Sequence, residues 1–222
     1  MQITEGTVPF RGNRTWYRIA GPWPARDRPP LLVLHGGPGV PHGYLWDLSD
    51  FSSRGRTVVF YDQSGCGRSG PLADPAEWTV ATFAAEIDAV RAGLGLDRVH
   101  LFGHSWGGML ALSYALGRPD GLASLVPAGT PAASALFAAG VRGLPATLPG
   151  TVAETLARHE EAGTTDSEEY QAAAGEFYVR WMCRVTPYPD HVAEASARRT
   201  GSCTGRWSAP SGTSPAVSRT GT

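Results

Sequence analysis

The sequence predicts an α/β fold, with a mainly parallel β-sheet, helices on both faces and a helical cap insertion, in a chain of 222 residues. Over the first 130 residues, short continuous apolar runs alternate with segments of helical periodicity. A long Ala- and Glu-rich stretch with no strand pattern follows. Strands buried on both faces read as unbroken apolar runs, and their alternation with helices gives βαβ units. We therefore expect the sheet in the first part and the cap in the second.

Six strands and two helices are expected in the first part. A strand pair joined by a turn at 11–13 opens the chain over residues 2–20. Buried strands follow at 31–34, 57–61 and 99–102, and a weaker candidate lies at 122–126, beside Pro127, which is unfavourable in a central strand. Helical patterns cover 80–94, capped by Thr79 or Thr82, and 109–116. These strands and helices together predict an α/β core over residues 1–130.

The chain changes character twice after residue 130. Residues 131–194 read as several helices and form the expected cap. In residues 195–222, Ser, Thr and Gly make up 15 of 28 residues, and Asp and Glu are absent. This composition predicts an irregular tail.

The overall composition excludes several classes of protein. Apolar residues make up 42% and charged residues 18% of the chain, and the net charge is −1, which suits a buried core but neither nucleic-acid nor electrostatic membrane binding. No apolar run reaches the roughly 18 residues of a membrane span, and no leader is apparent. Three cysteines at unrelated spacings (Cys66, Cys183, Cys203) argue against a disulfide framework or zinc site, so a cytoplasmic location is expected.

The segment Gly103-His104-Ser105-Trp106-Gly107 fits the pattern G-x-S-x-G. It lies between a predicted buried strand and a predicted helix, which is where this pattern forms a nucleophile elbow. Small residues at Gly103 and Gly107 allow strand and helix to approach, and the turn presents the Ser105 hydroxyl as a nucleophile. The structural alternative is a Gly-rich turn with an idle serine.

A second Gly-rich turn, at residues 35–39, follows the strand at 31–34. It begins with His35, and its glycines would let a backbone N–H enter the site without obstruction by a side chain. We expect Gly37, and Gly36 next, to pair with the Trp106 N–H as oxyanion donors. The structural alternative is an ordinary strand–helix turn.

The loop at residues 62–69 follows the strand at 57–61. It lacks the spacing and the Lys-Ser/Thr of a P-loop, so a phosphate site is rejected. Asp62 and Arg68 are expected to fix the loop beside the site, and Cys66 is expected to be packed rather than reactive.

Together these motifs resemble the proline iminopeptidase (prolyl aminopeptidase) family of the α/β-hydrolases. The matching pieces are His35-Gly-Gly-Pro-Gly39, Asp62-Gln-x-Gly-x-Gly-x-Ser69, Gly103-x-Ser-Trp-Gly-Gly108 and a cap piece at 177–184 followed by Pro187 and Pro189. The resemblance covers roughly residues 1–194. It implies the α/β-hydrolase fold and release of an N-terminal proline, or another small residue, from peptides, amides or esters, without a metal or cofactor.

The sequence departs from this family in its acid and base. In α/β-hydrolases these residues follow the nucleophile, on loops after later strands. After Ser105 the only histidines are His159 and His191, both in the expected cap, and the adjacent pair Asp190–His191 is a poor candidate. The family's acid and base would lie beyond residue 222, so we expect the chain to stop early, with C-terminal strands missing. A frameshift in a GC-rich gene from about residue 195 would explain the tail.

Three interpretations remain open. The first is a serine aminopeptidase of the proline iminopeptidase type, with Ser105 as nucleophile, a small peptide or amide as substrate and little turnover by this chain. The second is an α/β-hydrolase acting on esters or lactones; epoxides rank low because their opening would need an aspartate at position 105. The third is a non-catalytic product. The sequence leaves the oligomeric state open.

Overall fold

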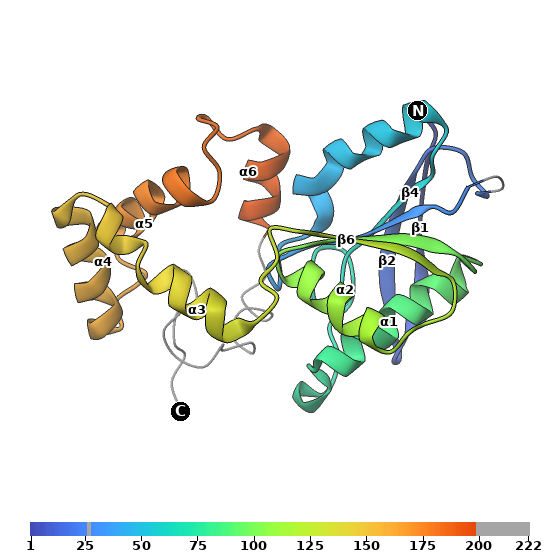
Figure 1. Cartoon of the computed structure of the whole chain (residues 1–222), viewed down its shortest axis with the longest axis horizontal. Helices are drawn as coiled ribbons and strands as arrows, with labels where there is room; N and C mark the ends of the chain where they lie inside the picture. Colours follow the sequence, from blue (N-terminus) through green and yellow to red (C-terminus); the bar gives the residue numbers. More distant parts are fainter. Residues whose placement is uncertain (26–27, 199–222) are drawn as a thin grey trace. The chain divides into compact units, whose positions relative to one another are not determined.

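The structure is a computed structural model that describes residues 1–25 and 28–198. The described chain forms two compact units. Of the described residues, the first consists of Met1–Thr130 together with His191–Arg198, and the second consists of Pro131–Asp190. Both are drawn in Figure 1.

The first unit is built on a six-stranded sheet in the order β1-β2-β4-β3-β5-β6. β1 pairs antiparallel with β2 and β2 antiparallel with β4, whereas the other neighbours are parallel. The bounds are β1 Ile3–Phe10, β2 Asn13–Ala20, β3 Leu31–Leu34, β4 Val58–Tyr61, β5 Val99–His104 and β6 Leu122–Ala128. The sheet confirms the expected mainly parallel α/β architecture.

The central strands form because their residues are apolar on both faces. All four residues of β3 and all four of β4 are buried. Alternate residues of these strands, among them Val33 and Phe60, join a cluster with Leu45 and Trp46 of the 3-10 segment η1 (His42–Arg54). Figure 1 shows η1 on one side of the sheet and the helices α1 (Val80–Gly93) and α2 (Trp106–Leu116) on the other.

Most predicted elements are confirmed, with shifted ends. The Thr79 hydroxyl accepts a hydrogen bond from the Thr82 N–H at 3.1 Å, so Thr79 caps α1. β2 starts at Asn13, which was expected in the turn. β6 runs through Pro127 to Ala128 and is an edge strand of the described sheet, a position where proline is tolerated. The segment η1 and a short 3-10 turn, η2 (Pro75–Glu77), were not predicted.

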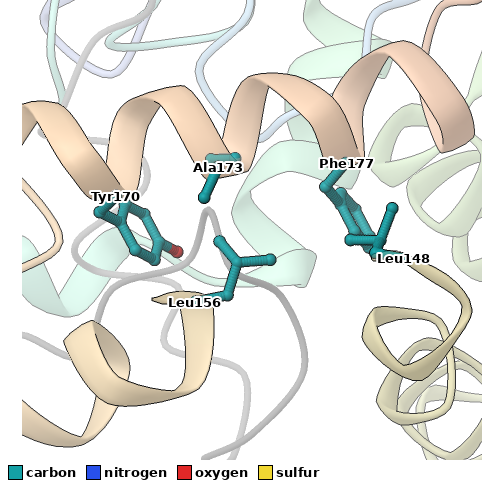
Figure 2. Close-up of a cluster of buried hydrophobic side chains, with 6 residues drawn as sticks. Leu148, Leu156, Tyr170, Ala173 and Phe177 are labelled. Carbon is teal, nitrogen blue, oxygen red and sulfur yellow. The ribbon is translucent and has the colours of Figure 1, made fainter. Parts of the chain in front are cut away.

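The second unit is helical. It contains α3 (Ser134–Arg142), η3 (Pro145–Thr147), α4 (Gly150–Ala162) and α5 (Glu168–Trp181), and α5 is capped by the Ser167 hydroxyl. Figure 2 shows its core, in which Leu148, Leu156, Tyr170, Ala173 and Phe177 gather with Ala174 between the helices. These helices agree with the helical character expected for this stretch.

The end of the described chain differs from the sequence-based expectation. α6 (Asp190–Ala197) extends into the stretch expected to be an irregular tail from residue 195, and from His191 onward it clusters with the first unit rather than with the cap helices. The rest of the expected tail, residues 199–222, lies outside the described residues. No helix among the described residues is both long and apolar enough to cross a membrane.

Candidate active site

Ser105 occupies the turn between β5 and α2. Its backbone has φ 52° and ψ −118°, a conformation that is strained for a residue with a side chain. The Ser105 N–H donates to the Ala128 carbonyl oxygen at 2.9 Å, which ties the turn to the end of β6. Ser105 is partly exposed, and none of the described residues hydrogen-bonds its hydroxyl. This geometry is that expected of a nucleophile elbow.

The tightness of this turn depends on two glycines. A Cβ at Gly103 would overlap the backbone of Gly107, and a Cβ at Gly107 would overlap the carbonyl oxygens of Leu34 and His35. Only hydrogen fits at either position. The start of α2 therefore packs directly against the end of β3.

The 35–39 turn lies against the elbow. A Cβ at Gly36 would be 3.1 Å from both Nδ1 and the carbonyl oxygen of His104, the residue before Ser105. Gly37 has φ 118°, a conformation that favours glycine. The structure thus brings together the two loops expected to supply the oxyanion donors.

The two candidate donors in this turn differ in their partners. The Gly36 N–H donates to the Tyr44 hydroxyl at 2.7 Å, so it is already engaged. Within the described residues the Gly37 N–H has no acceptor. The ranking of Gly37 before Gly36 is therefore favoured, and Gly36 is better assigned a structural role.

Tyr44, which the sequence analysis did not single out, links the turn to the elbow. Its hydroxyl accepts from Gly36 and lies 2.8 Å from His104 Nδ1. Burial lowers the pKa of His104. The His104 ring thus faces Tyr44 and, through it, the 35–39 turn.

Gln63 connects both loops. Its Nε2 donates to the His35 carbonyl at 2.8 Å, and its Oε1 accepts from Trp106 Nε1 at 2.9 Å. Its backbone N–H donates to His35 Nε2 at 2.9 Å. Since Nε2 of His35 is an acceptor, its Nδ1 carries the hydrogen and faces the Gly36 carbonyl at 3.0 Å; burial lowers the pKa of this neutral ring.

Asp62 fixes the 62–69 loop, as expected. Its carboxylate accepts from the backbone N–H and from Nδ1 of His42, at 3.1 and 2.8 Å, and from the Arg68 N–H at 3.0 Å. Although burial opposes it, hydrogen bonding and the charge of His42 lower the pKa of Asp62. The Arg68 side chain does not join it but lies over Trp16, 4.7 Å from the ring centroid. Cys66 is buried, in line with the packed role expected for it.

Glu86, on α1, is a fully buried carboxylate that the sequence analysis missed. It accepts from the Ser64 N–H at 3.0 Å and from the hydroxyls of Ser64 and Thr15 at 2.7 and 2.5 Å. Burial raises its pKa to about 7, against the effect of these hydrogen bonds. Its position between Phe83 and Ile87 on the apolar face of the helical pattern is the signal that could have revealed it.

The structure gives the histidines after Ser105 other partners. His159 contacts Thr164 at 2.7 Å and Glu169 at 3.2 Å, within the second unit. His191 lies 3.5 Å from an Asp47 carboxylate oxygen of η1. Neither of these two rings hydrogen-bonds to Ser105. Across residues 1–25 and 28–198, no three His, Cys, Asp or Glu side chains are grouped as metal ligands.

Fold and elbow together define an α/β-hydrolase, and a family model described as the alpha/beta hydrolase fold matches residues 29–209. The chain is 41% identical over 181 residues to the proline iminopeptidase of Clostridium botulinum (strain Hall), covering 81% of this chain and 61% of that enzyme. Among solved structures, VinJ aligns with a TM-score of 0.84 at 43% identity, and the proline iminopeptidase of Mycobacterium smegmatis with 0.79 at 42%. Each alignment covers 88% of this chain and 67% of the other.

The chain belongs to the proline iminopeptidase family of the α/β-hydrolases. It spans about 61–64% of the length of the first curated relatives it matches.

Proposed function

We propose that this chain carries the nucleophile and oxyanion site of a serine hydrolase that releases an N-terminal proline, or another small residue, from peptides or amides. The observation that carries the proposal is the strained conformation of Ser105 beside the 35–39 turn. Membership of the proline iminopeptidase family supports the substrate class.

The proposed reaction is acyl transfer through Ser105. Its Oγ forms a bond to the substrate carbonyl carbon, and the N–H groups of Gly37 and Trp106 receive the negative charge that develops on the carbonyl oxygen. The C–N bond then breaks, and the leaving amine takes the proton that the serine hydroxyl has given up. Water then adds to the acyl carbon, which releases the acid and returns a proton to Oγ. A serine hydroxyl needs a base for the first step.

The described residues place no base beside Ser105. No described histidine hydrogen-bonds to the Ser105 hydroxyl, and loss of the base lowers the rate by several powers of ten in serine hydrolases. We therefore propose that the 222-residue chain, assayed alone, turns over a proline arylamide slowly or not measurably. Full turnover would contradict this expectation.

A fluorophosphonate probe tests the nucleophile, because it bonds covalently to a serine that lies beside oxyanion donors, although more slowly where no base activates the hydroxyl. We expect slow covalent labelling of the 222-residue chain, mapped by peptide mass spectrometry to Ser105, and none in Ser105→Ala. Equal labelling of the variant, or no labelling of either protein, would reject the proposal. Parallel assays of an aryl ester and a proline arylamide separate the ester-hydrolase alternative, which predicts turnover of the ester alone.

A further inference from the structure

We infer that Gln63 is a positioning residue that holds the two oxyanion donors, Gly37 and Trp106, at a fixed separation. The inference deepens the proposed function and rests on it. Gln63 belongs to neither loop that carries a donor, yet its side chain bonds to both.

The orientation of the Gln63 amide is determined by its partners. A backbone carbonyl only accepts hydrogen bonds and an indole N–H only donates them. The amide nitrogen must therefore face the His35 carbonyl, at 2.8 Å, and the amide oxygen must face Trp106 Nε1, at 2.9 Å. The residue is only 2% exposed, so water does not compete well for these groups.

The two anchors lie close to the donors along the chain. The first anchor, the His35 carbonyl, lies two residues before Gly37. The His35 side chain is held as well, because the Gln63 backbone N–H donates to His35 Nε2 at 2.9 Å. The other anchor is the side chain of Trp106, whose own backbone N–H is the second proposed donor. A displacement of Gln63 would therefore move one donor relative to the other.

This separation matters for the chemistry because an oxyanion donor works only over a narrow range, about 2.7–3.1 Å from the charged oxygen. Two donors on separate loops meet that requirement together only if the loops are connected. The backbone of Gly107 packs directly against the end of β3, which connects the two loops through their backbones. The Gln63 side chain connects them a second time, because it bonds to His35 in one loop and to Trp106 in the other.

Two substitutions separate the contributions of the amide. Gln63→Glu keeps an acceptor for the indole but loses the donor to the His35 carbonyl. Gln63→Met keeps the length of the side chain but loses both bonds. Both variants leave buried polar groups unpaired, so lower stability by itself is no evidence for positioning.

The matched control is Tyr114→Phe. The Tyr114 hydroxyl bonds to Arg91 at 2.7 Å and to Asp88. Both partners lie on α1, and neither belongs to the candidate site. This variant should lose stability without disturbing the donors. Each variant is measured at a temperature where circular dichroism shows it to be folded.

The kinetic experiment is fluorophosphonate labelling of the 222-residue chain at several probe concentrations. We expect Gln63→Met and Gln63→Glu to lower the maximal labelling rate constant by 10- to 100-fold with little change in the probe concentration at half-maximal rate, and Tyr114→Phe to leave both unchanged. Labelling of the Gln63 variants at the wild-type rate, or an equal loss in Tyr114→Phe, would overturn the inference.

A second measurement does not need the reaction. In ¹H–¹⁵N spectra, Gln63→Met should shift the backbone amide signals of both Gly37 and Trp106, whereas Tyr114→Phe should leave them in place. Unmoved signals would overturn the positioning role. If the amides shift but wild-type Ser105 is never labelled, the proposed function fails while the structural link stands.

Discussion

At the scale of single residues, Tyr61 is unusual because its buried hydroxyl has no hydrogen-bond partner among the described residues. An unsatisfied buried hydroxyl costs about 1–3 kcal/mol. We therefore expect Tyr61→Phe to leave the free energy of unfolding unchanged or to raise it by about 1 kcal/mol, measured by urea denaturation. Tyr114→Phe is the contrast, since its hydroxyl is bonded, and it should be destabilising. A clear loss of stability in Tyr61→Phe would show that the hydroxyl has a partner.

Glu86 should make the stability of the protein depend on pH. Its pKa rises from 4.5 to about 7 on folding, mainly through burial, and the groups around it are Thr15, Ser64 and Tyr61. Because the folded state holds the proton more tightly, this contribution is complete below pH 4.5 and is lost as pH rises through about 7, by roughly 3 kcal/mol in all.

The variant that tests this dependence is Glu86→Gln, which cannot ionise. Denaturation at a series of pH values should show the wild type losing stability relative to the variant between about pH 4.5 and 7. Parallel curves across that range would mean that Glu86 titrates normally.

At the scale of elements, the β5–α2 turn depends on the absence of a side chain at Gly107. We expect Gly107→Ala to destabilise the first unit by about 3 kcal/mol or more and to abolish probe labelling, because its Cβ would overlap the carbonyl oxygens of Leu34 and His35. Thermal denaturation and labelling measure the two effects.

The control for this prediction is Gly175→Ala, in the middle of α5. A Cβ there meets nothing within 4 Å, and alanine is the better helix former by about 1 kcal/mol. It should therefore be neutral or stabilising. A similar loss in both variants would show that crowding at the elbow is not the cause.

The elements themselves were largely predictable from sequence. The apolar runs that became β3 and β4 are buried on both faces, so the pattern had one simple explanation. The elbow was predictable because a strand, a helix and a glycine pattern coincide around Ser105. The segment η1 was not predicted, since its periodicity is weak and His42 and Ser49 are its only buried residues.

The supporting residues of the site were harder to predict. Gln63 and Tyr44 act through hydrogen bonds to groups 28 and 8 residues away, respectively, and to others still further along the chain. Such contacts depend on how β3, β4 and β5 come together, and no local pattern encodes them. Asp62 was predictable as a loop anchor because a carboxylate beside a Gly-rich turn commonly accepts backbone N–H groups.

At the scale of the whole molecule, β6 leaves one edge of the described sheet without a neighbouring strand. Val126 on this strand is 46% exposed, and an exposed apolar edge favours association between molecules. We expect Val126→Lys to reduce concentration-dependent light scattering while changing the free energy of unfolding by less than about 0.5 kcal/mol.

Leu116→Lys serves as the control for added charge. Leu116 is 85% exposed at the end of α2 and lies on no strand edge. If association proceeds through the β6 edge, this substitution should reduce scattering less than Val126→Lys does. An equal reduction would point to net charge instead.

The Tyr44 hydroxyl has a single hydrogen to give, and this has a consequence for acid sensitivity. Its oxygen receives the Gly36 N–H, and among the described residues His104 Nδ1 is the acceptor within reach of its own hydrogen, an arrangement that fits the Nε2–H tautomer of His104. Protonation of His104 would place a second hydrogen on the same line and force the phenol to rotate. Since burial lowers the pKa of His104, this exchange of donor and acceptor between the two side chains would occur only in acid, below the usual titration range of histidine, and the Tyr44 oxygen would still accept the Gly36 N–H.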